Sequence, residues 1–262
     1  MEIISSIYWN ASREIFSLGP LSIRWYGLLF ALGFVVGYQI MQWVYKRENK
    51  TQKQLDSLAI TMILSTVIGA RLGHCLFYEP QIYLSDPISI LKVWEGGLAS
   101  HGAAIGIIFG LWLHIRKQKD ISLIWILDRI VIVVALAGFF IRLGNFFNSE
   151  IYGTPADLPW AVVFAQIDDI PRHPVQIYES LSYLLIFLFL FFAYKINYQK
   201  LKDGFLFGFF LILVFGVRFI LEYFKSNQTD LEMDLPLKMG QILSIPFIIA
   251  GFYFLFKKFI KK

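Results

Sequence analysis

Charged side chains are scarce in this sequence. Only 16% of its 262 residues are Asp, Glu, Lys or Arg, whereas 57% are hydrophobic. A soluble domain carries charge on about a quarter of its residues. The shortage therefore argues against an ordinary soluble enzyme and predicts a polytopic membrane protein.

Cysteine is almost absent, and the familiar catalytic motifs are missing. Cys75 is the only cysteine, which excludes an internal disulfide. Because it lies in an apolar run, we interpret it as a packing residue rather than a nucleophile. The four histidines lack metal-ligand spacing, and the sequence holds no P-loop, dinucleotide fingerprint or Gly-x-Ser-x-Gly motif. We expect no metal and no cofactor.

The basic excess of +5 does not indicate nucleic acid as a partner. Its Lys and Arg residues stand between apolar runs, and no nucleic-acid-binding motif is present. Residues 1–6 lack the cationic start of a cleavable signal peptide. The first span is therefore expected to direct the chain to the membrane.

Long apolar runs fill most of the chain. A transmembrane helix needs about 20 mainly apolar residues, and seven stretches qualify. They cover approximately residues 25–44, 58–77, 98–115, 123–141, 177–194, 205–224 and 239–256. We predict an all-α membrane protein with seven transmembrane helices in a single domain, 1–262. Glycine pairs at four-residue spacing, such as Gly69/Gly73 and Gly102/Gly106, favour close helix packing.

The connectors alternate in charge, which predicts the orientation of the helices. Every second connector and the C-terminal tail are rich in Lys and Arg, and such segments stay in the cytoplasm. The N-terminus is then outside and the C-terminus is cytoplasmic. The external loops are expected at 78–97, 142–176 and 225–238.

Polar residues gather near the predicted outer ends of the spans. They are Arg24, Tyr26, Arg71, His74, His101, Arg142, Asn145, His173, Arg218 and Glu222. A cation at the centre of a spanning helix costs about 2.5–3.5 kcal/mol on insertion scales, so such residues usually serve a function. We therefore expect a prepared polar site near the outer leaflet.

Simpler explanations exist for several of these residues. Arg218 and Glu222, four residues apart on one helix face, can form a structural ion pair. Arg71 can donate to loop carbonyls, and His101 can be an ordinary polar residue at a helix start. Arg142 is harder to explain in this way, because Asn145, Asn148 and Glu150 follow it at the same membrane boundary.

Arginine matches phosphate well, since its planar fork donates to two phosphate oxygens at once. Several arginines near the headgroup layer therefore predict an anionic lipid as ligand. These residues by themselves do not separate binding a lipid from reacting with it.

Several motifs resemble those of the bacterial phosphatidylglycerol–prolipoprotein diacylglyceryl transferases. The main one is Arg142-Leu-Gly-Asn-Phe-Phe-Asn-Ser-Glu-Ile-Tyr-Gly153. The others are Ile23-Arg-Trp-Tyr-Gly27, Gly69-Ala-Arg-Leu-Gly73, Trp94-Glu-Gly-Gly-Leu-Ala-Ser-His-Gly102, Arg172-His-Pro-Val-Gln-Ile-Tyr-Glu179 and Arg218-Phe-Ile-Leu-Glu222. The resemblance extends from about Ile23 to Gln241. It departs from the family at Ile141, where glycine is usual, and at Ser100 and Ala103 beside the His-Gly pair.

The resemblance implies a reaction. The diacylglyceryl group of phosphatidylglycerol would move to the thiol of the lipobox cysteine in a prolipoprotein signal peptide, forming a thioether and releasing glycerol phosphate. The partners would be these two substrates and the lipid bilayer. The location would be the bacterial cytoplasmic (inner) membrane, with the active site toward its outer face.

The resemblance also suggests roles for the polar residues. The expected catalytic residues are His101 as the thiol base, with Arg142 and Arg218 on the phosphate. The expected substrate-binding residues are Tyr26, Arg71, Asn145, Asn148, Glu150, Gly153, His173 and Glu222, with Glu222 orienting Arg218. The alternative is a membrane transporter or lipid flippase with an anionic-lipid site near the outer leaflet. Transporter sites usually lie near the bilayer midplane on broken helices, whereas the polar residues of this sequence lie to one side of the membrane.

Overall fold

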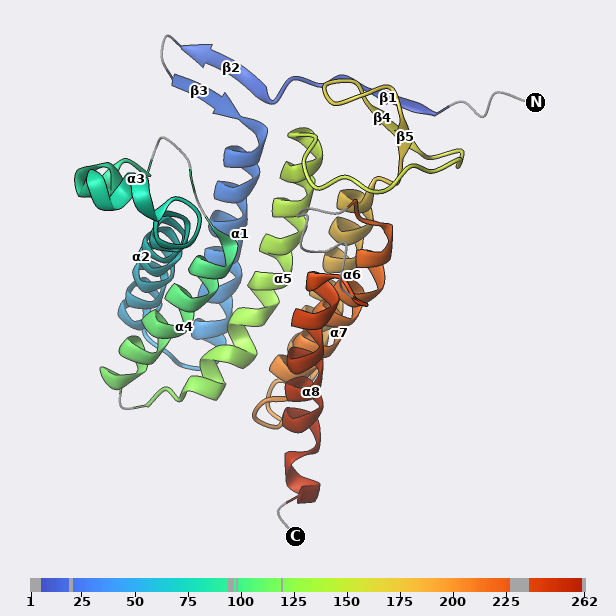
Figure 1. Ribbon diagram of the computed structural model, residues 1–262. Coiled ribbons are helices and arrows are strands. Elements are labelled where there is room, and N and C mark those ends of the chain that lie inside the picture. The colour runs from blue at the N-terminus through green and yellow to red at the C-terminus, as the bar shows by residue number, and fades with distance from the viewer. Residues whose placement is uncertain are drawn as a thin grey trace. The chain divides into compact units, whose positions relative to one another are not determined.

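A computed structural model of the chain describes residues 6–18, 21–93, 97, 99–118, 120–226 and 236–260 (Figure 1). Trp94, Glu95, Gly96 and Leu98 of the predicted Gly-Gly-x-x-x-His-Gly motif lie outside these residues, as does 227–235 of the third predicted external loop. The chain forms two compact units. Unit 1 comprises Met1–Ile40 with Leu127–Lys262, and unit 2 comprises Met41–Ile126.

Most of the described chain is helical. The long helices are α1 (Trp25–Arg47), α2 (Gln52–Phe77), α4 (Ser100–Arg116), α5 (Leu123–Phe147), α6 (Val175–Asn197), α7 (Phe205–Leu221) and α8 (Met239–Ile260). The short ones are α3 (Pro80–Ser85), η1 (Pro87–Leu91) and η3 (Glu222–Phe224). Among the described residues, six helices are long and apolar enough to cross a membrane, which supports a multi-pass membrane protein.

The remaining predicted span, 98–115, coincides with α4. This helix has 17 residues, a length of about 25 Å at 1.5 Å per residue. The hydrocarbon core of a bilayer is about 30 Å thick. The count of seven spans and the orientation of the termini stay predictions.

Strands are few and short, but the expectation of an all-α fold was too simple. In unit 1, β4 (Val162–Phe164) pairs in parallel with β1 (Ile7–Trp9) and antiparallel with β5 (Pro171–Arg172). A separate hairpin joins β2 (Glu14–Leu18) to β3 (Leu21–Arg24). The small sheet packs onto the end of α5, because Phe146 forms a buried cluster with Val162 and Phe164.

The end of α5 differs from the prediction. The fourth span was expected to stop at residue 141 and a loop to begin at 142, yet the helix continues to Phe147. Arg142 and Asn145 therefore stand on a helix. Their side chains find polar partners there, so the last turns tolerate them without unwinding.

An aspartate inside the apolar part of α5 has a structural role in unit 1. Asp128 is 2% exposed, and its carboxylate accepts hydrogen bonds from the backbone N–H groups of Gly204 at 2.7 Å and Phe207 at 2.9 Å. These donors belong to the start of α7, whose first N–H groups lack partners within the helix. Gly204, at the N-cap of α7, adopts a positive φ of 86°, a conformation that favours glycine.

In unit 2, glycines bring α2 and α4 into direct contact (Figure 1). A Cβ atom at Gly102 would overlap the carbonyl oxygen of Gly69 and the Cα atom of Gly73, and one at Gly106 would overlap the carbonyl oxygen of Ser65. The glycine spacing predicted close packing of this kind, and the structure confirms it for this helix pair. Gly33 similarly faces Ala137 within unit 1.

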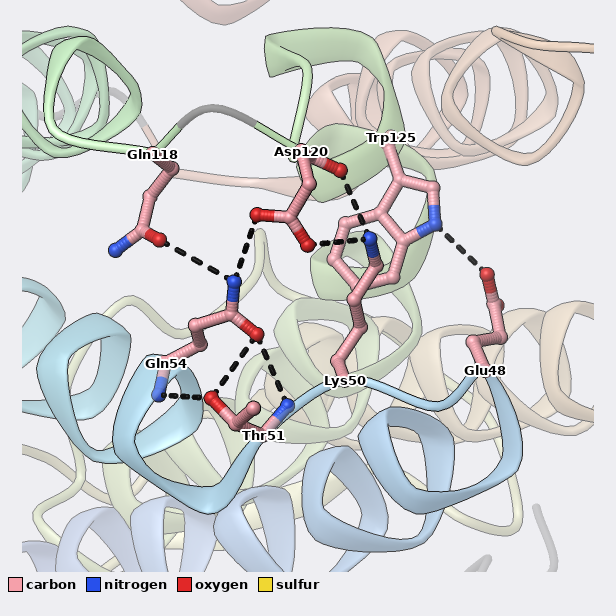
Figure 2. A network of polar contacts seen from close by, with 7 residues as sticks. All are labelled: Glu48, Lys50, Thr51, Gln54, Gln118, Asp120 and Trp125. Atoms are coloured by element: carbon pink, nitrogen blue, oxygen red, sulfur yellow. Dashed lines mark hydrogen bonds and ion pairs between the residues drawn. The ribbon is translucent and has the colours of Figure 1, made fainter.

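Within unit 2, a polar network joins the connector between α1 and α2 to the connector between α4 and α5 (Figure 2). The Lys50 ammonium lies 2.9 Å from the Asp120 carboxylate, and Gln54 donates to the same carboxylate at 2.8 Å. These hydrogen bonds lower the pKa of Asp120, so it stays ionised at neutral pH. The Trp125 indole donates to Glu48 at 2.7 Å. Thr51 and Gln54 also form a capping box that begins α2 six residues earlier than the predicted 58.

The close approach of α2 and α4 yields a stability prediction. Gly102→Ala should lower the free energy of unfolding by about 1–3 kcal/mol, because the new methyl group meets backbone atoms that cannot give way. Gly216→Ala in α7 is the matched control, since no atom lies within 4 Å of its added Cβ. Thermal unfolding in detergent measures both variants. Equal midpoints would contradict the packing argument.

Candidate active site

The polar cluster of unit 1 begins where α5 ends in a strained turn. After Phe147 the chain reverses through Ser149 and Ile151, which adopt positive φ angles of 55° and 54°. A left-handed conformation is unusual for a β-branched residue such as Ile151, and such strain costs on the order of 1–3 kcal/mol per residue. The Glu150 N–H donates to the Asn145 carbonyl at 3.0 Å, which folds the turn back onto the helix.

Side chains of the main motif, Arg142 to Gly153, which we call the signature segment, form one hydrogen-bonded series. The Arg142 guanidinium donates to the Asn145 side-chain oxygen at 3.3 Å. The Asn145 amide donates to one carboxylate oxygen of Glu150 at 3.3 Å, and the Asn148 amide donates to the other at 3.2 Å. The structure thus brings together all four polar residues that the sequence singled out in this segment.

A fully buried carboxylate lies at the centre of the cluster. Glu179 on α6 has 0% exposed side chain, and its two oxygens lie 2.9 Å from Arg142 Nε and 2.9 Å from Lys225 Nζ. Gly138 makes this approach possible, because a side chain there would collide with the ring of Tyr183, one turn beyond Glu179. A buried charge is tolerated only when it is paired, so Glu179 fixes both cations.

The pairing continues from Lys225 to a second buried carboxylate. Lys225 has a 4% exposed side chain and lies 3.0 Å from the Glu222 carboxylate. Gly240 lies directly against that carboxylate and leaves no room for a Cβ. The Lys238 ammonium donates to the Lys225 carbonyl. Arg142, Glu179, Lys225 and Glu222 therefore form a continuous, formally neutral chain of charges.

Glu222 is paired with a residue that the sequence analysis did not name. Glu222 was expected to orient Arg218, four residues earlier, but within the described part of the chain its ion pair is with Lys225. The reason is that α7 ends at Leu221 and passes into the tighter η3 turn, which brings residues 222 and 225 together. Arg218 is left outside the paired chain.

Arg218 has an unsatisfied donor. Its Nε atom is buried, and none of the described residues accepts a hydrogen bond from it. The charges of Arg142 and Arg218 both act on the hydroxyl of Tyr183, which is 7% exposed. The two arginines of the predicted site therefore lie around one phenol, and one of them has a donor to spare.

Tyr26 lies beside the same cluster. A Cβ at Gly144 would meet the Tyr26 ring at 2.9 Å, so this glycine lets the first helix approach the end of α5. The charges of Glu150 and Arg142 act on the Tyr26 hydroxyl. Tyr26 was predicted to contact the substrate headgroup, and the structure places it next to the signature residues.

Gly153 and His173 form a wall of the cluster through their backbones. The Gly153 N–H donates to the His173 carbonyl at 3.0 Å, and Gly153 also bridges to Lys225. A Cβ at Gly153 would collide with His173 and with the Phe224 carbonyl. Burial lowers the pKa of the His173 imidazole, so it is neutral at pH 7. Nδ1 of this ring lies 3.3 Å from the Tyr178 hydroxyl.

Two predicted site residues belong to unit 2. Arg71 is 3% exposed and donates to the carbonyls of Ile90 at 3.0 Å and Ser89 at 2.7 Å. Its guanidinium also lies over the Tyr83 ring. These contacts match the simpler reading of Arg71 as an anchor for the segment after α2. His101 is exposed at the first turn of α4, with its ring 5.6 Å from that of Tyr78.

Sequence reasoning missed Glu179, Lys225 and Tyr183. Glu179 carried a usable signal, because it is an acid one turn inside an apolar helix and closes the His-Pro motif. Lys225 stands three residues after Glu222, a spacing that permits an ion pair. Tyr183 gave no signal, since tyrosines are common in membrane helices.

An open guanidinium donor in the cluster favours an anion as ligand. The four charges of the paired chain cancel, and the Nε of Arg218, outside that chain, is buried without an acceptor among the described residues. A guanidinium with an open donor binds a phosphate by charge-assisted hydrogen bonds. Among the described residues, no group of three His, Cys, Asp or Glu side chains converges to hold a metal ion.

Comparison with known proteins identifies the family. A family model described as prolipoprotein diacylglyceryl transferase matches residues 13–257. The phosphatidylglycerol–prolipoprotein diacylglyceryl transferase of Tolumonas auensis is 51% identical over 245 residues, which cover 94% of this chain and 95% of the relative. The proteins of the same name from Chloroherpeton thalassium and Bacteroides fragilis are 50% and 42% identical, with coverage of 98% and 97% of this chain and 96% of each relative. The chain therefore belongs to the prolipoprotein diacylglyceryl transferase family.

Proposed function

We propose that this protein transfers the sn-1,2-diacylglyceryl group of phosphatidylglycerol to the thiol of a prolipoprotein's lipobox cysteine. The relatives are named for this donor and this acceptor. The observation that carries the proposal is Arg218, whose unsatisfied Nε lies beside a neutral chain of buried ion pairs. That arrangement leaves a guanidinium N–H available to donate to a lipid phosphate.

The reaction needs stabilisation of a phosphate that gains charge. The thiolate sulfur forms a bond to the terminal carbon of the diacylglyceryl group while the bond from that carbon to the phosphate oxygen breaks. Glycerol phosphate leaves with the electron pair, so a phosphodiester monoanion becomes a monoester of greater negative charge. Cationic donors that are already in place bind this charge more tightly as it develops, which lowers the barrier.

We assign the phosphate to Arg218 and Arg142, with different tasks. Arg142 already donates to Asn145 and is paired with Glu179, so it holds the site in shape and adds positive potential. Arg218 supplies the free donor. Asn145, Asn148 and Glu150 present polar atoms suited to the glycerol hydroxyls, and Tyr26 a hydroxyl suited to the headgroup. Glu222 acts through Lys225 rather than through Arg218.

Of the remaining predicted residues, His101 is proposed as the base that ionises the thiol. A cysteine thiol has a pKa near 8.5, so only a few per cent is thiolate at neutral pH. An exposed imidazole at a helix start is free to accept its proton. Gly153 and His173 shape the wall through their backbones, and Arg71 orders the segment after α2.

The orientation in the membrane is also part of the proposal. The alternation of basic connectors supports seven spans with the N-terminus outside and the C-terminus cytoplasmic. Residues 1–262 then form a single integral-membrane domain in the bacterial inner membrane, with the external loops lying within 78–97, 142–176 and 225–238. The polar end of α5 would face the outer leaflet, where the precursor's lipobox cysteine arrives.

A conservative change at Arg218 tests the phosphate assignment. Arg218→Lys keeps the charge but loses the planar fork, and removal of one preorganised donor typically costs about 10²–10³ in turnover. Arg47→Lys, at the end of α1, is the matched control and should keep full activity. The measurement is the mass gain of a lipobox peptide incubated with phosphatidylglycerol and the protein. Full activity of Arg218→Lys would rule out the phosphate contact. As a control on the assay, a peptide with Ser in place of the lipobox Cys should gain no mass.

Lys225 tests the buried chain of charges. Lys225→Met leaves two buried carboxylates without their shared cation and should lower the free energy of unfolding by about 3–5 kcal/mol at pH 7. Lys225→Arg retains the charge and should lose far less.

The two variants together separate this charge effect from lost packing. Both replace the lysine side chain, but only Lys225→Met removes the cation that the two carboxylates share. Thermal unfolding in detergent at pH 7 measures both variants, and equal losses would indicate packing alone.

The base is tested by a pH profile of activity. His101→Gln should lower turnover at pH 7 by about 10²–10⁴, the usual contribution of a general base. Its residual activity should rise with pH as the substrate thiol ionises by itself. His74→Gln is the control, because its Nε2 lies at the same end of unit 2 and 3.3 Å from the Glu79 carboxylate. If the pH profile of His101→Gln activity parallels that of the unaltered protein, a group other than His101 is the base.

A further inference from the structure

Tyr183 lies in the contact between α5 and α6, one helical turn from Glu179. A Cβ at Gly138 would lie 2.9 Å from the Tyr183 ring. One turn further along α5, Arg142 Nε lies 2.9 Å from the Glu179 carboxylate. The order of these two contacts along the helices is reversed, so α5 and α6 run antiparallel and pack Tyr183 beside the buried ion pair. Tyr183 is only 7% exposed.

The Tyr183 hydroxyl reaches back to that ion pair. Side chains of an α-helix lean toward its N-terminus, over the residue one turn earlier, and on α6 that residue is Glu179. A hydrogen bond joins the Arg142 guanidinium to the hydroxyl. Since arginine can only donate, the phenol oxygen accepts this bond. The proton of the hydroxyl is therefore left for another acceptor.

None of the residues that the structure describes accepts the Tyr183 proton. The Glu179 carboxylate, one turn away, is at ion-pair distance from Arg142 and Lys225 and takes no hydrogen bond from the phenol. The Asn145 side-chain oxygen accepts from Arg142. Polar groups of buried side chains are nearly always hydrogen-bonded, so a donor without an acceptor indicates a ligand or a water molecule.

A second open donor lies near this hydroxyl. The charge of Arg218 acts on the Tyr183 hydroxyl, as the charge of Arg142 does. Arg218 Nε is itself buried without an acceptor in the described part of the chain. Two donors that lack acceptors thus gather around one place. A phosphate is the complementary group, because its non-bridging oxygens accept several hydrogen bonds and donate none.

We propose that the Tyr183 hydroxyl donates a hydrogen bond to a non-bridging phosphate oxygen of the lipid donor, which makes Tyr183 a catalytic residue. This role rests on the proposed function, because it requires the phosphate to lie at Arg142 and Arg218. The bond strengthens as the departing glycerol phosphate gains charge, so it stabilises the transition state more than the bound lipid. Arg142 polarises the phenol by donating to its oxygen, which makes the phenol a better donor.

The proton stays on Tyr183 throughout the reaction. A phosphate monoester dianion takes up a proton with a pKa of about 6, whereas a phenol loses its proton with a pKa of about 10. The leaving group is therefore too weak a base to remove the phenol proton. Tyr183 acts by hydrogen bonding and adds no proton-transfer step to the exchange of the carbon–oxygen bond for the carbon–sulfur bond.

Tyr183→Phe tests this role, because it removes the hydroxyl and keeps the ring that packs against Gly138. Turnover of a lipobox peptide with phosphatidylglycerol should fall about 10–100-fold, the usual contribution of a hydrogen bond to a charged group. The loss should appear in kcat more than in KM, since the contact is strongest in the transition state.

Tyr45→Phe is the matched control. Tyr45 is 1% exposed, and its hydroxyl has no hydrogen-bond partner among the described residues. It lies near the end of α1, whereas Tyr26 of the candidate site lies at the start of that helix. Tyr45→Phe makes the same chemical change in a buried tyrosine, and it should leave kcat and KM close to those of the unaltered protein.

A sulfur-substituted lipid supplies a measurement that altered packing would not change. In the phosphorothioate of phosphatidylglycerol, sulfur replaces one non-bridging oxygen, and the two isomers at phosphorus carry it at different positions. Sulfur is a weak hydrogen-bond acceptor, so the unaltered protein should transfer from one isomer more slowly. Tyr183→Phe should reduce the ratio of the two single-turnover rates several-fold, and Tyr45→Phe should not. This ratio does not depend on the amount of folded protein.

Three results would overturn the proposal. Full activity of Tyr183→Phe beside a large loss in Arg218→Lys would keep the phosphate site and exclude the Tyr183 contact. Lowered turnover of Tyr183→Phe with an unchanged isomer ratio would assign the loss to packing. Full activity of Arg218→Lys, or no mass gain with the unaltered protein, would overturn the proposed function and the role of Tyr183 with it.

Discussion

The buried carboxylate of Glu179 is the interaction on which the polar cluster depends. It is fully buried, and Arg142 and Lys225 each lie 2.9 Å from one of its oxygens. Those two contacts tie α5, α6 and the segment after η3 to one point. Each cation also contacts a second group: Arg142 donates to Asn145 beside the signature turn, and Lys225 pairs with Glu222. The result is a rigid set of fixed charges beside the Arg218 Nε donor, which has no acceptor among the described residues.

Rigidity matters because charges that are already in position accelerate the transfer of the diacylglyceryl group. Transition-state stabilisation by fixed donors needs no reorganisation when the phosphate gains charge. The strained turn at Ser149 and Ile151 and the crowded Gly153 serve the same end, because they hold the signature residues against the wall formed with His173. The small sheet of β1, β4 and β5 anchors this end of α5 through Phe146 and Phe164.

Much of this architecture was readable from the sequence, for definite reasons. Apolar runs are long-range averages, and all seven predicted spans coincide with helices. The nearness of Arg142 and Asn145 followed from helical spacing, and Asn148 and Glu150 follow them closely in the sequence at the same membrane boundary. The family followed from ordered motifs, and the comparisons confirm it. The short strands were missed because runs of two to five residues in a loop leave no periodic signal.

The ion pairs were beyond sequence reasoning because they depend on contacts between helices. Arg218 and Glu222 have ideal helical spacing. Glu222 nevertheless forms its ion pair with Lys225, because α7 passes into η3 at this point. Glu179 and Arg142 lie 37 positions apart on different helices, which pack closely where Gly138 faces the Tyr183 ring. Arg71 similarly found its partners in the carbonyls of Ser89 and Ile90.

The account rests on Arg142 and Arg218 serving one phosphate, and a double-mutant cycle tests this most directly. The values of kcat/KM are measured for the unaltered protein, Arg142→Lys, Arg218→Lys and the double variant with phosphatidylglycerol and a lipobox peptide. Two side chains that share an anion should be coupled, so the loss in the double variant should differ clearly from the product of the single losses. Simple multiplication of the two losses would mean that the arginines act independently, and would contradict the account.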